Sequence, residues 1–220
     1  MRYAHVPLVA AMLACFPAAP ARAADPGWGF RVFAAGFDPD TRETILNPER
    51  QEIDVVARSA LGAGAGLEYR FTARIGLDLG VMAGAPDIEL SQDVPTIGPV
   101  SLSDSMTTVV GTADLLVHLT PGRSVVLYIG AGMARIWYGD LSYGFEDLGS
   151  FDVSVEDDLT WSVRAGIDIA LGADSGWSAV GGVRYIPSTL DVWQTGTPAD
   201  ATTSFDFNIF SATAGVGYRF

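Results

Sequence analysis

The stretch LTWSVRAGIDIAL, residues 159–171, alternates strictly between two kinds of side chain. Its odd positions, from Leu159 to Leu171, are all apolar, whereas its even positions are small or polar and include Arg164 and Asp168. A period of two is typical of a β-strand with one apolar face. The run exceeds the roughly five or six residues of an ordinary strand and suits the roughly 9–11 that a tilted strand needs to cross a bilayer.

Seven further segments alternate in the same way, and no convincing helical periodicity separates them. The sequence therefore predicts eight strands, at 27–37, 55–71, 75–85, 106–119, 125–139, 159–171, 177–193 and 205–220. The connections at 72–74, 120–124 and 172–176 are tight turns, whereas those at 38–54, 86–105, 140–158 and 194–204 are long. Short turns at one end and long loops at the other predict an all-β fold, an eight-stranded antiparallel up-and-down transmembrane β-barrel with four extracellular loops.

A soluble, lipocalin-like barrel would also have eight strands, but its polar faces would point outward. The faces that would then meet water carry Gly62, Gly64 and Gly66, and later Gly130 and Gly132. Glycine is depleted in strands, and a water-facing position normally holds a charged residue or Thr. The repeated glycines therefore favour the membrane barrel.

The N-terminus has the pattern of a secretory signal peptide over residues 1–23, with an apolar run at 6–16 and a small-residue site at Ala21-Arg22-Ala23. The run is too short to span a membrane, so residues 24–220 form the predicted barrel. The one cysteine, Cys15, would be the acylated residue under a lipoprotein interpretation; cleavage after the small-residue site would remove it. We expect a protein of the outer membrane of a Gram-negative bacterium.

The acidic residues are distributed unevenly along the chain. The chain has 220 residues, 49% of them hydrophobic, with mean hydropathy +0.26 and a net charge of −13; all 13 basic residues are Arg. This hydropathy excludes a disordered acidic protein, and the acidic excess argues against a nucleic-acid partner. Of the 26 acids, 20 lie in the four long connections and their margins. They form either a solvated anionic face or a site for divalent cations bridging to lipopolysaccharide, with Glu156, Asp157 and Asp158 as the densest group.

Alternation also sorts the residues that would face the lumen. Toward the turn end they are charged: Arg31, Glu68, Arg70, Asp78, Asp114, Arg164, Asp168, Arg184 and Arg219, with His118 beside them. Side chains nearly fill an eight-stranded barrel, so buried charges are tolerable there only in pairs. We interpret this charged floor as a structural network of salt bridges that fills the lumen; a proton or ion relay is the alternative. Toward the loop end the inward residues are apolar: Phe33, Phe37, Val56, Met82, Met106, Ile136, Ile186, Leu190, Phe207 and Ile209.

The apolar upper lumen either binds a small hydrophobic ligand or packs as a dry core. Pro187 cannot donate a ladder hydrogen bond, so it is a candidate lateral gate; alternatively it marks where the strand leaves the membrane.

Catalysis has little support. Beyond the signal peptide His118 is the only histidine, and the sequence holds no Cys/His metal cluster, phosphate loop or nucleotide fingerprint. We therefore expect no enzymatic activity and no cofactor.

Several short motifs resemble the OmpW family of outer-membrane barrels, in the same order along the chain: Ala83-Gly84-Ala85-Pro86, Tyr128 to Met133 with Trp137-Tyr138, Val183-Arg184-Tyr185-Ile186, and Gly215 to Phe220. The family tends to place a His shortly after the proline, but here Asp87-Ile88-Glu89-Leu90 follows, so no ligand role of that His transfers. The resemblance implies a narrow apolar lumen that binds or passes small hydrophobic molecules. Gly215, Tyr218 and Phe220 also look like the terminal-strand signal read by the outer-membrane assembly machinery.

Two functions are compatible with these features. In the first, the barrel binds or passes small hydrophobic molecules and releases them sideways into lipid. Its partners are then these solutes, outer-membrane lipid, lipopolysaccharide and the assembly machinery. In the second, the barrel is a structural or interaction protein whose acidic loops serve adhesion, phage or host contact, or envelope stability.

Overall fold

The computed structural model describes residues 26–46, 52–94, 98–145, 149–172, 175–194 and 203–220. The predicted signal peptide, with Cys15, lies outside these residues. Every element in the described ranges is a β-strand. The described residues contain no helix long and apolar enough to cross a membrane.

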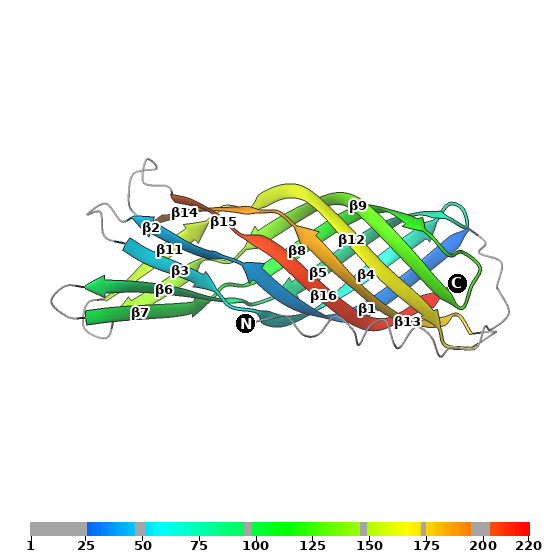
Figure 1. The fold of residues 1–220 in the computed structure, drawn as a ribbon, viewed down its shortest axis with the longest axis horizontal. Helices are drawn as coiled ribbons and strands as arrows, with labels where there is room; N and C mark the ends of the chain where they lie inside the picture. The colour runs from blue at the N-terminus through cyan, green and yellow to red at the C-terminus, as the bar shows by residue number, and fades with distance from the viewer. Residues whose placement is uncertain (1–25, 47–51, 95–97, 146–148, 173–174, 195–202) are drawn as a thin grey trace, which may run out of the picture.

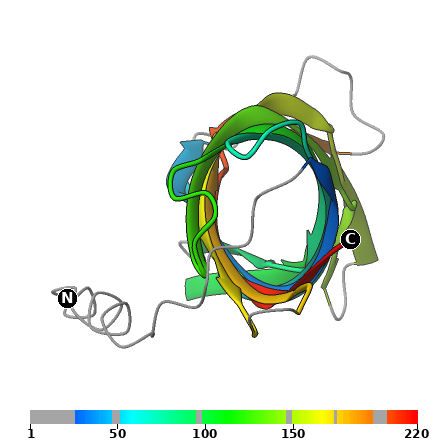
Figure 2. The same cartoon turned by 90° about the vertical axis from the view of Figure 1, so that its right-hand side faces the viewer.

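Eight strands close into one antiparallel barrel, in the order β1-β16-β13-β12-β9-β8-β5-β4 (Figure 1). Seen from its turn end, the ring of strands is complete (Figure 2). The predicted fold class is therefore confirmed. The strands are β1 (Gly27–Asp40), β4 (Ala60–Arg70), β5 (Ile75–Gly84), β8 (Thr108–His118), β9 (Val125–Tyr138), β12 (Asp158–Ala170), β13 (Trp177–Ile186) and β16 (Asn208–Arg219).

The four long connections are not open loops where the structure describes them, because they contain strands that prolong the barrel on one side (Figure 1). One four-stranded sheet has the order β2-β3-β6-β7 and a second has the order β10-β11-β14-β15. Their strands are β2 (Arg42–Leu46), β3 (Glu52–Ala57), β6 (Asp87–Val94), β7 (Gly98–Ser105), β10 (Leu141–Phe145), β11 (Gly149–Val155), β14 (Thr189–Gln194) and β15 (Thr203–Asp206). Much of the surplus acid thus sits on two ordered sheets, which we call the extension sheets.

Three predicted strands are divided at the junction between the barrel and the extension sheets. The run 55–71 breaks at Arg58 and Ser59, the run 177–193 breaks after Ile186, and the run 205–220 breaks at Phe207. The first break shifts the alternation by one residue, as a bulge does. Val55, only 1% exposed, therefore packs into the core, and the inward assignment of Val56 was wrong.

The outside of the barrel is apolar and has an aromatic belt near each end. Side chains of the middle band, such as Leu79, Val81 and Ile129, are about half exposed. Toward the turns the exposed aromatic residues are Trp28, Phe30, Phe71, Trp177 and Phe220; toward the extension sheets they are Trp137, Trp161, Tyr185 and Phe210. An apolar band between two aromatic girdles is the surface of a barrel in a lipid bilayer.

Glycines on the inner face of β4 make room for the large inward side chains of β1. In the register between these strands, Phe33 lies opposite Gly64 and Arg31 opposite Gly66. A Cβ atom on Gly64 would lie 2.5 Å from the Phe33 ring and 2.6 Å from the carbonyl oxygen of Val81. The glycines that argue against a soluble barrel are thus needed because two neighbouring strands cannot both carry bulky groups into so narrow a lumen.

We expect Gly64→Ala to destabilise the barrel by about 1–3 kcal/mol, because the backbone of β5 cannot move away as easily as a flexible side chain. Urea unfolding in lipid vesicles measures this difference. The matched control is Ala65→Val on the outer face of the same strand, which should change stability by less than about 0.5 kcal/mol. Equal effects of the two substitutions would contradict this account of the glycines.

Candidate functional site

The charged floor is divided into an acidic wall and a basic wall. Glu68 on β4 lies opposite Asp78 on β5, which in turn lies opposite Asp114 on β8. Across the lumen, Arg164 on β12 lies opposite Arg184 on β13. Like charges that face each other on neighbouring strands are destabilising, so each of these residues needs a partner of opposite charge. Asp78 and Asp114 find theirs across the lumen, whereas Glu68 pairs with Arg70 of its own strand.

The upper layer of the floor is a set of such cross-lumen pairs. Asp78, fully buried, accepts a hydrogen bond from Arg164 Nη1 at 2.7 Å and forms an ion pair with Arg31. Asp114, also fully buried, accepts from Arg184 Nη2 at 2.6 Å and from the Ser162 hydroxyl at 2.8 Å. These contacts tie β1, β5, β8, β12 and β13 together through the middle of the barrel. They provide the pairing that buried charges require.

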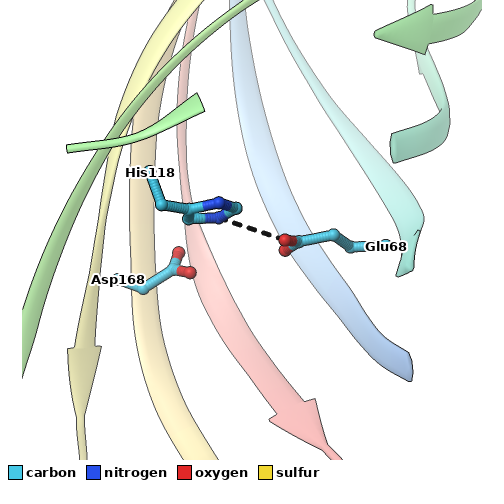
Figure 3. Close-up of side chains that lie close together, drawn as sticks. All are labelled: Glu68, His118 and Asp168. Carbon is cyan, nitrogen blue, oxygen red and sulfur yellow. Dashed lines mark ion pairs between the residues drawn. The ribbon is translucent and has the colours of Figure 1, made fainter. Parts of the chain in front are cut away.

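The lower layer lies nearer the turns and is less completely paired. Arg70 donates from Nε to Glu68 Oε1 at 2.7 Å and from Nη2 to Asp168 Oδ2 at 3.2 Å. Arg219 approaches Glu68 only to 3.7 Å. Figure 3 shows the imidazole of His118 directed toward Glu68, with the Asp168 carboxylate below both; His118 Nε2 is 3.1 Å from Glu68 Oε1.

The structure thus brings all nine predicted floor residues, and His118, into two connected layers. Two contributors were missed because they are uncharged. The Tyr128 hydroxyl accepts a hydrogen bond from Arg164 at 2.9 Å, and the guanidinium lies 5.1 Å from the Tyr128 ring centroid. Ser162 bridges Arg184 and Asp114. Their inward parity was the one signal that could have identified them.

Two cavities border the floor. A cavity of about 260 Å³ lies at the turn end, lined by Arg70, Asp168 and Arg219 together with turn residues such as Arg123 and Ser124. A smaller one, of about 30 Å³, lies above it beside Asp78 and Thr112. The second has room for roughly one water molecule. Between them the paired side chains close the lumen, which excludes a wide aqueous pore through the described floor.

Above the floor the lumen is packed with apolar side chains. Eight of the ten predicted apolar lumen residues are 4% exposed or less: Phe37, Met82, Met106, Ile136, Ile186, Leu190, Phe207 and Ile209. Phe33 packs against this cluster and is partly buried. Val55, which was not among the predicted residues, also belongs to it. We call this set the apolar plug; whether it binds a ligand stays a prediction.

The barrel wall has a break beside the apolar plug. β12 pairs with β13 from Ala170 and Ser178 up to Val163 and Tyr185. The next backbone hydrogen bond across this seam runs from Glu156 N to Asp191 O, at 3.0 Å. Residues 157–162 and 186–190 therefore face each other without a described backbone ladder. Pro187, the gate candidate, lies within this interval and has no N–H to donate.

Side chains bridge the break on both faces of the wall. On the inner face, the Ser188 hydroxyl donates to Asp158 Oδ2 at 2.7 Å and lies 2.8 Å from the Tyr138 hydroxyl. On the outer face, Trp161 and Tyr185 meet edge to face with ring centroids 6.1 Å apart. The break therefore sits at the aromatic belt nearer the extension sheets and is held by side chains that can move without disturbing a ladder.

The three acids proposed as a weak metal site are engaged separately. Glu156 is exposed, Asp157 pairs with Arg135 at 3.2 Å, and Asp158 accepts from Ser188. Glu156 and Asp157 lie between β11 and β12 and Asp158 is the first residue of β12, and the contacts of Asp157 and Asp158 go to different strands and segments. In the described residues, three ligand atoms come together at Glu68, His118 and Asp168 instead.

The residues of the predicted assembly signal lie on β16 and just beyond it. Tyr218 packs among Phe30, Trp177 and Phe220, and Phe220 is 75% exposed. Gly215 allows close contact with β1, because a Cβ atom there would lie 2.0 Å from the Val32 carbonyl oxygen. Recognition of these residues by the assembly machinery stays a prediction.

The family model described as outer membrane protein beta-barrel domain matches residues 8–220. The chain belongs to this family. Its location is accordingly the outer membrane. No curated protein sequence matches the chain.

Solved structures with the same fold support the assignment. OprG from Pseudomonas aeruginosa is 17% identical with a TM-score of 0.67, and the match covers 90% of this chain and 97% of OprG. AlkL is 18% identical with a TM-score of 0.58, over 93% of this chain and 95% of AlkL. A major outer membrane protein from Thermus thermophilus is 14% identical, with a TM-score of 0.51 over 88% and 99% of the two chains. The resemblance to OmpW-type barrels is thereby confirmed at the level of the fold.

We expect Asp114→Asn to destabilise the barrel by about 3–5 kcal/mol, because it leaves the buried guanidinium of Arg184 without its carboxylate. The double variant Asp114→Leu with Arg184→Leu should recover much of this loss, since neither charge then remains. Urea unfolding in lipid vesicles measures both. The control is Asp157→Asn, which breaks the exposed pair with Arg135 and should cost at most about 1 kcal/mol. Similar losses of stability in all three variants would mean that the floor is not held together by its ion pairs.

Proposed function

We propose that this outer-membrane barrel binds small hydrophobic molecules within the apolar plug and releases them sideways into lipid through the break between β12 and β13. The observation that carries the proposal is the position of the break. It lies directly beside the apolar plug, above a floor that is closed by ion pairs. An apolar molecule in the upper lumen thus has lipid on one side and buried charge below, and only the first is a favourable environment for it.

The composition of the plug suits this role. It contains no charged side chain, and it includes Met82 and Met106, whose unbranched chains adapt to irregular shapes. A ligand that enters the plug would replace contacts among these side chains with its own apolar contacts to them. The apolar area that the plug residues bury would therefore change little. The bridge between Asp158 and Ser188 is the polar contact that must open for sideways release.

The break can be locked to test the route. We expect the double variant Asp158→Cys, Ser188→Cys, bridged by a short bis-methanethiosulfonate reagent, to take up an apolar dye into proteoliposomes several-fold more slowly than the unbridged protein. A reductant should restore uptake. The chain suits this experiment because its sole cysteine, Cys15, lies in the predicted signal peptide.

The matched control is the pair Thr44→Cys, Asp54→Cys in an extension sheet. Its side chains are also joined by a 2.7 Å hydrogen bond, but they lie within an intact ladder. Bridging this pair should leave uptake unchanged. Equal uptake by both bridged proteins would refute the sideways route.

Pro187→Ala tests the same break without a cross-link. Alanine restores the missing backbone donor, so the seam can close by one hydrogen bond, and we expect slower uptake of the apolar dye at equal barrel content. Pro39→Ala is the control, because Pro39 lies in the continuous register between β1 and β16. Unchanged uptake in the Pro187 variant would mean that the proline only marks the end of the strand.

A second candidate function is favoured by a different observation. The apolar plug is almost wholly buried, and the extension sheets are ordered, acidic and project beyond the barrel (Figure 1). Both features suit a barrel that displays a surface for adhesion, phage or host contact, or envelope stability. Uptake no faster than in protein-free liposomes, together with loss of surface binding when the extension sheets are shortened, would favour this function over transport.

A further inference from the structure

We propose that Glu68, His118 and Asp168 form a binding site for a divalent transition-metal ion of the Zn²⁺ class, at the turn end of the lumen. The three residues come from β4, β8 and β12, which are far apart in the sequence. Figure 3 shows their side chains converging on one region of the lumen. One ligand atom from each residue lies within 4.8 Å of the ligand atoms of the other two.

The strongest indication is the state of His118. Its side chain is 1% exposed, yet in the described structure neither ring nitrogen has a hydrogen-bond partner. Nε2 is 3.1 Å from Glu68 Oε1, which is ion-pair distance without the geometry of a hydrogen bond, and Nδ1 has no hydrogen-bond partner. A buried polar group without a partner is unusual and calls for a physical reason. A metal ion coordinated by a ring nitrogen would provide one.

Each of the two carboxylates has one oxygen atom that accepts no hydrogen bond from Arg70. Arg70 donates hydrogen bonds to Oε1 of Glu68 and to Oδ2 of Asp168. Oδ1 of Asp168 is buried and has no hydrogen-bond partner, and Oε2 of Glu68 lies 3.7 Å from Arg219 Nη2. Hydrogen bonds to the second oxygen of a ligating carboxylate are typical of metal sites, because they fix its orientation. Arg70 is therefore placed as a positioning residue rather than as the occupant of the site.

The donor set selects the class of ion. One imidazole nitrogen and two carboxylate oxygens suit Zn²⁺ and neighbouring first-row ions, whereas Ca²⁺ and Mg²⁺ prefer oxygen ligands throughout. Three protein ligands leave at least one coordination position open. Glu68 and Asp168 both line the cavity of about 260 Å³ at the turn end, so an ion and its remaining water ligands have a route to the site.

The test uses zinc chloride with the folded wild-type barrel in detergent, carrying ¹⁵N-labelled histidine. His5 lies in the predicted signal peptide, so His118 is the one histidine expected in the mature barrel. We expect its ring ¹⁵N signal to move on addition of one equivalent of Zn²⁺, with binding measured in parallel by calorimetry. Calorimetric binding without any change in the His118 signal would overturn the proposal, as would the absence of binding.

Variants separate this site from adventitious binding to the acidic extension sheets. His118→Asn and Glu68→Gln should each weaken Zn²⁺ binding by at least the roughly 10- to 100-fold that loss of an outer-shell partner costs. The control Asp157→Asn, outside the lumen, should bind as the wild type does. Zn²⁺ affinity unchanged in the His118 and Glu68 variants would refute the site. If either variant fails to fold, the wild-type histidine signal decides the question alone.

Discussion

The narrow lumen of an eight-stranded barrel imposes the constraint on which the rest of this structure depends. Nine charged side chains point into it, and the register sets like charges side by side: Asp78 beside Asp114, and Arg164 beside Arg184. Neither wall can be stable alone, because each would hold buried charges of one sign. Only closure of the sheet brings the walls within hydrogen-bond distance. The ion pairs of the floor and the closure of the barrel therefore depend on each other.

The same constraint determines what can pass. A floor of paired charges excludes apolar molecules because they would have to displace ion pairs, and it leaves little room for water. The apolar plug above it offers nothing to a polar solute. At the break between β12 and β13 the described wall of the barrel is held by side chains instead of a backbone ladder. This is the reason that the proposed passage leads sideways into the lipid and not across the full length of the lumen.

The acidic surplus has a different physical setting. Beyond the barrel the acids lie on sheets that meet water, where they can be solvated or paired at the surface. Glu89 illustrates this: it is hydrogen-bonded and ion-paired with Arg58, which lowers the pKa of its carboxyl below the usual range. Such exposed pairs contribute little to stability. The net charge of the chain is thus mainly a property of the extension sheets, whereas the floor nearly balances its own charge.

The sequence by itself determined the strand number, the inward and outward faces and the separation of a charged from an apolar lumen, because a period of two records which face each residue takes. It did not determine which charges form pairs. Arg70 and Asp168 pair across the barrel, and a local sequence pattern cannot predict a contact between residues so far apart in the chain. It also placed Val56 inward, because a one-residue shift at Arg58 leaves no clear mark in the alternation. Tertiary structure alone decided three features: the extension sheets, the break in backbone pairing at Pro187, and the convergence of His118 with two carboxylates. All three depend on closure of the sheet, which brings residues distant in the sequence to the same height in the barrel.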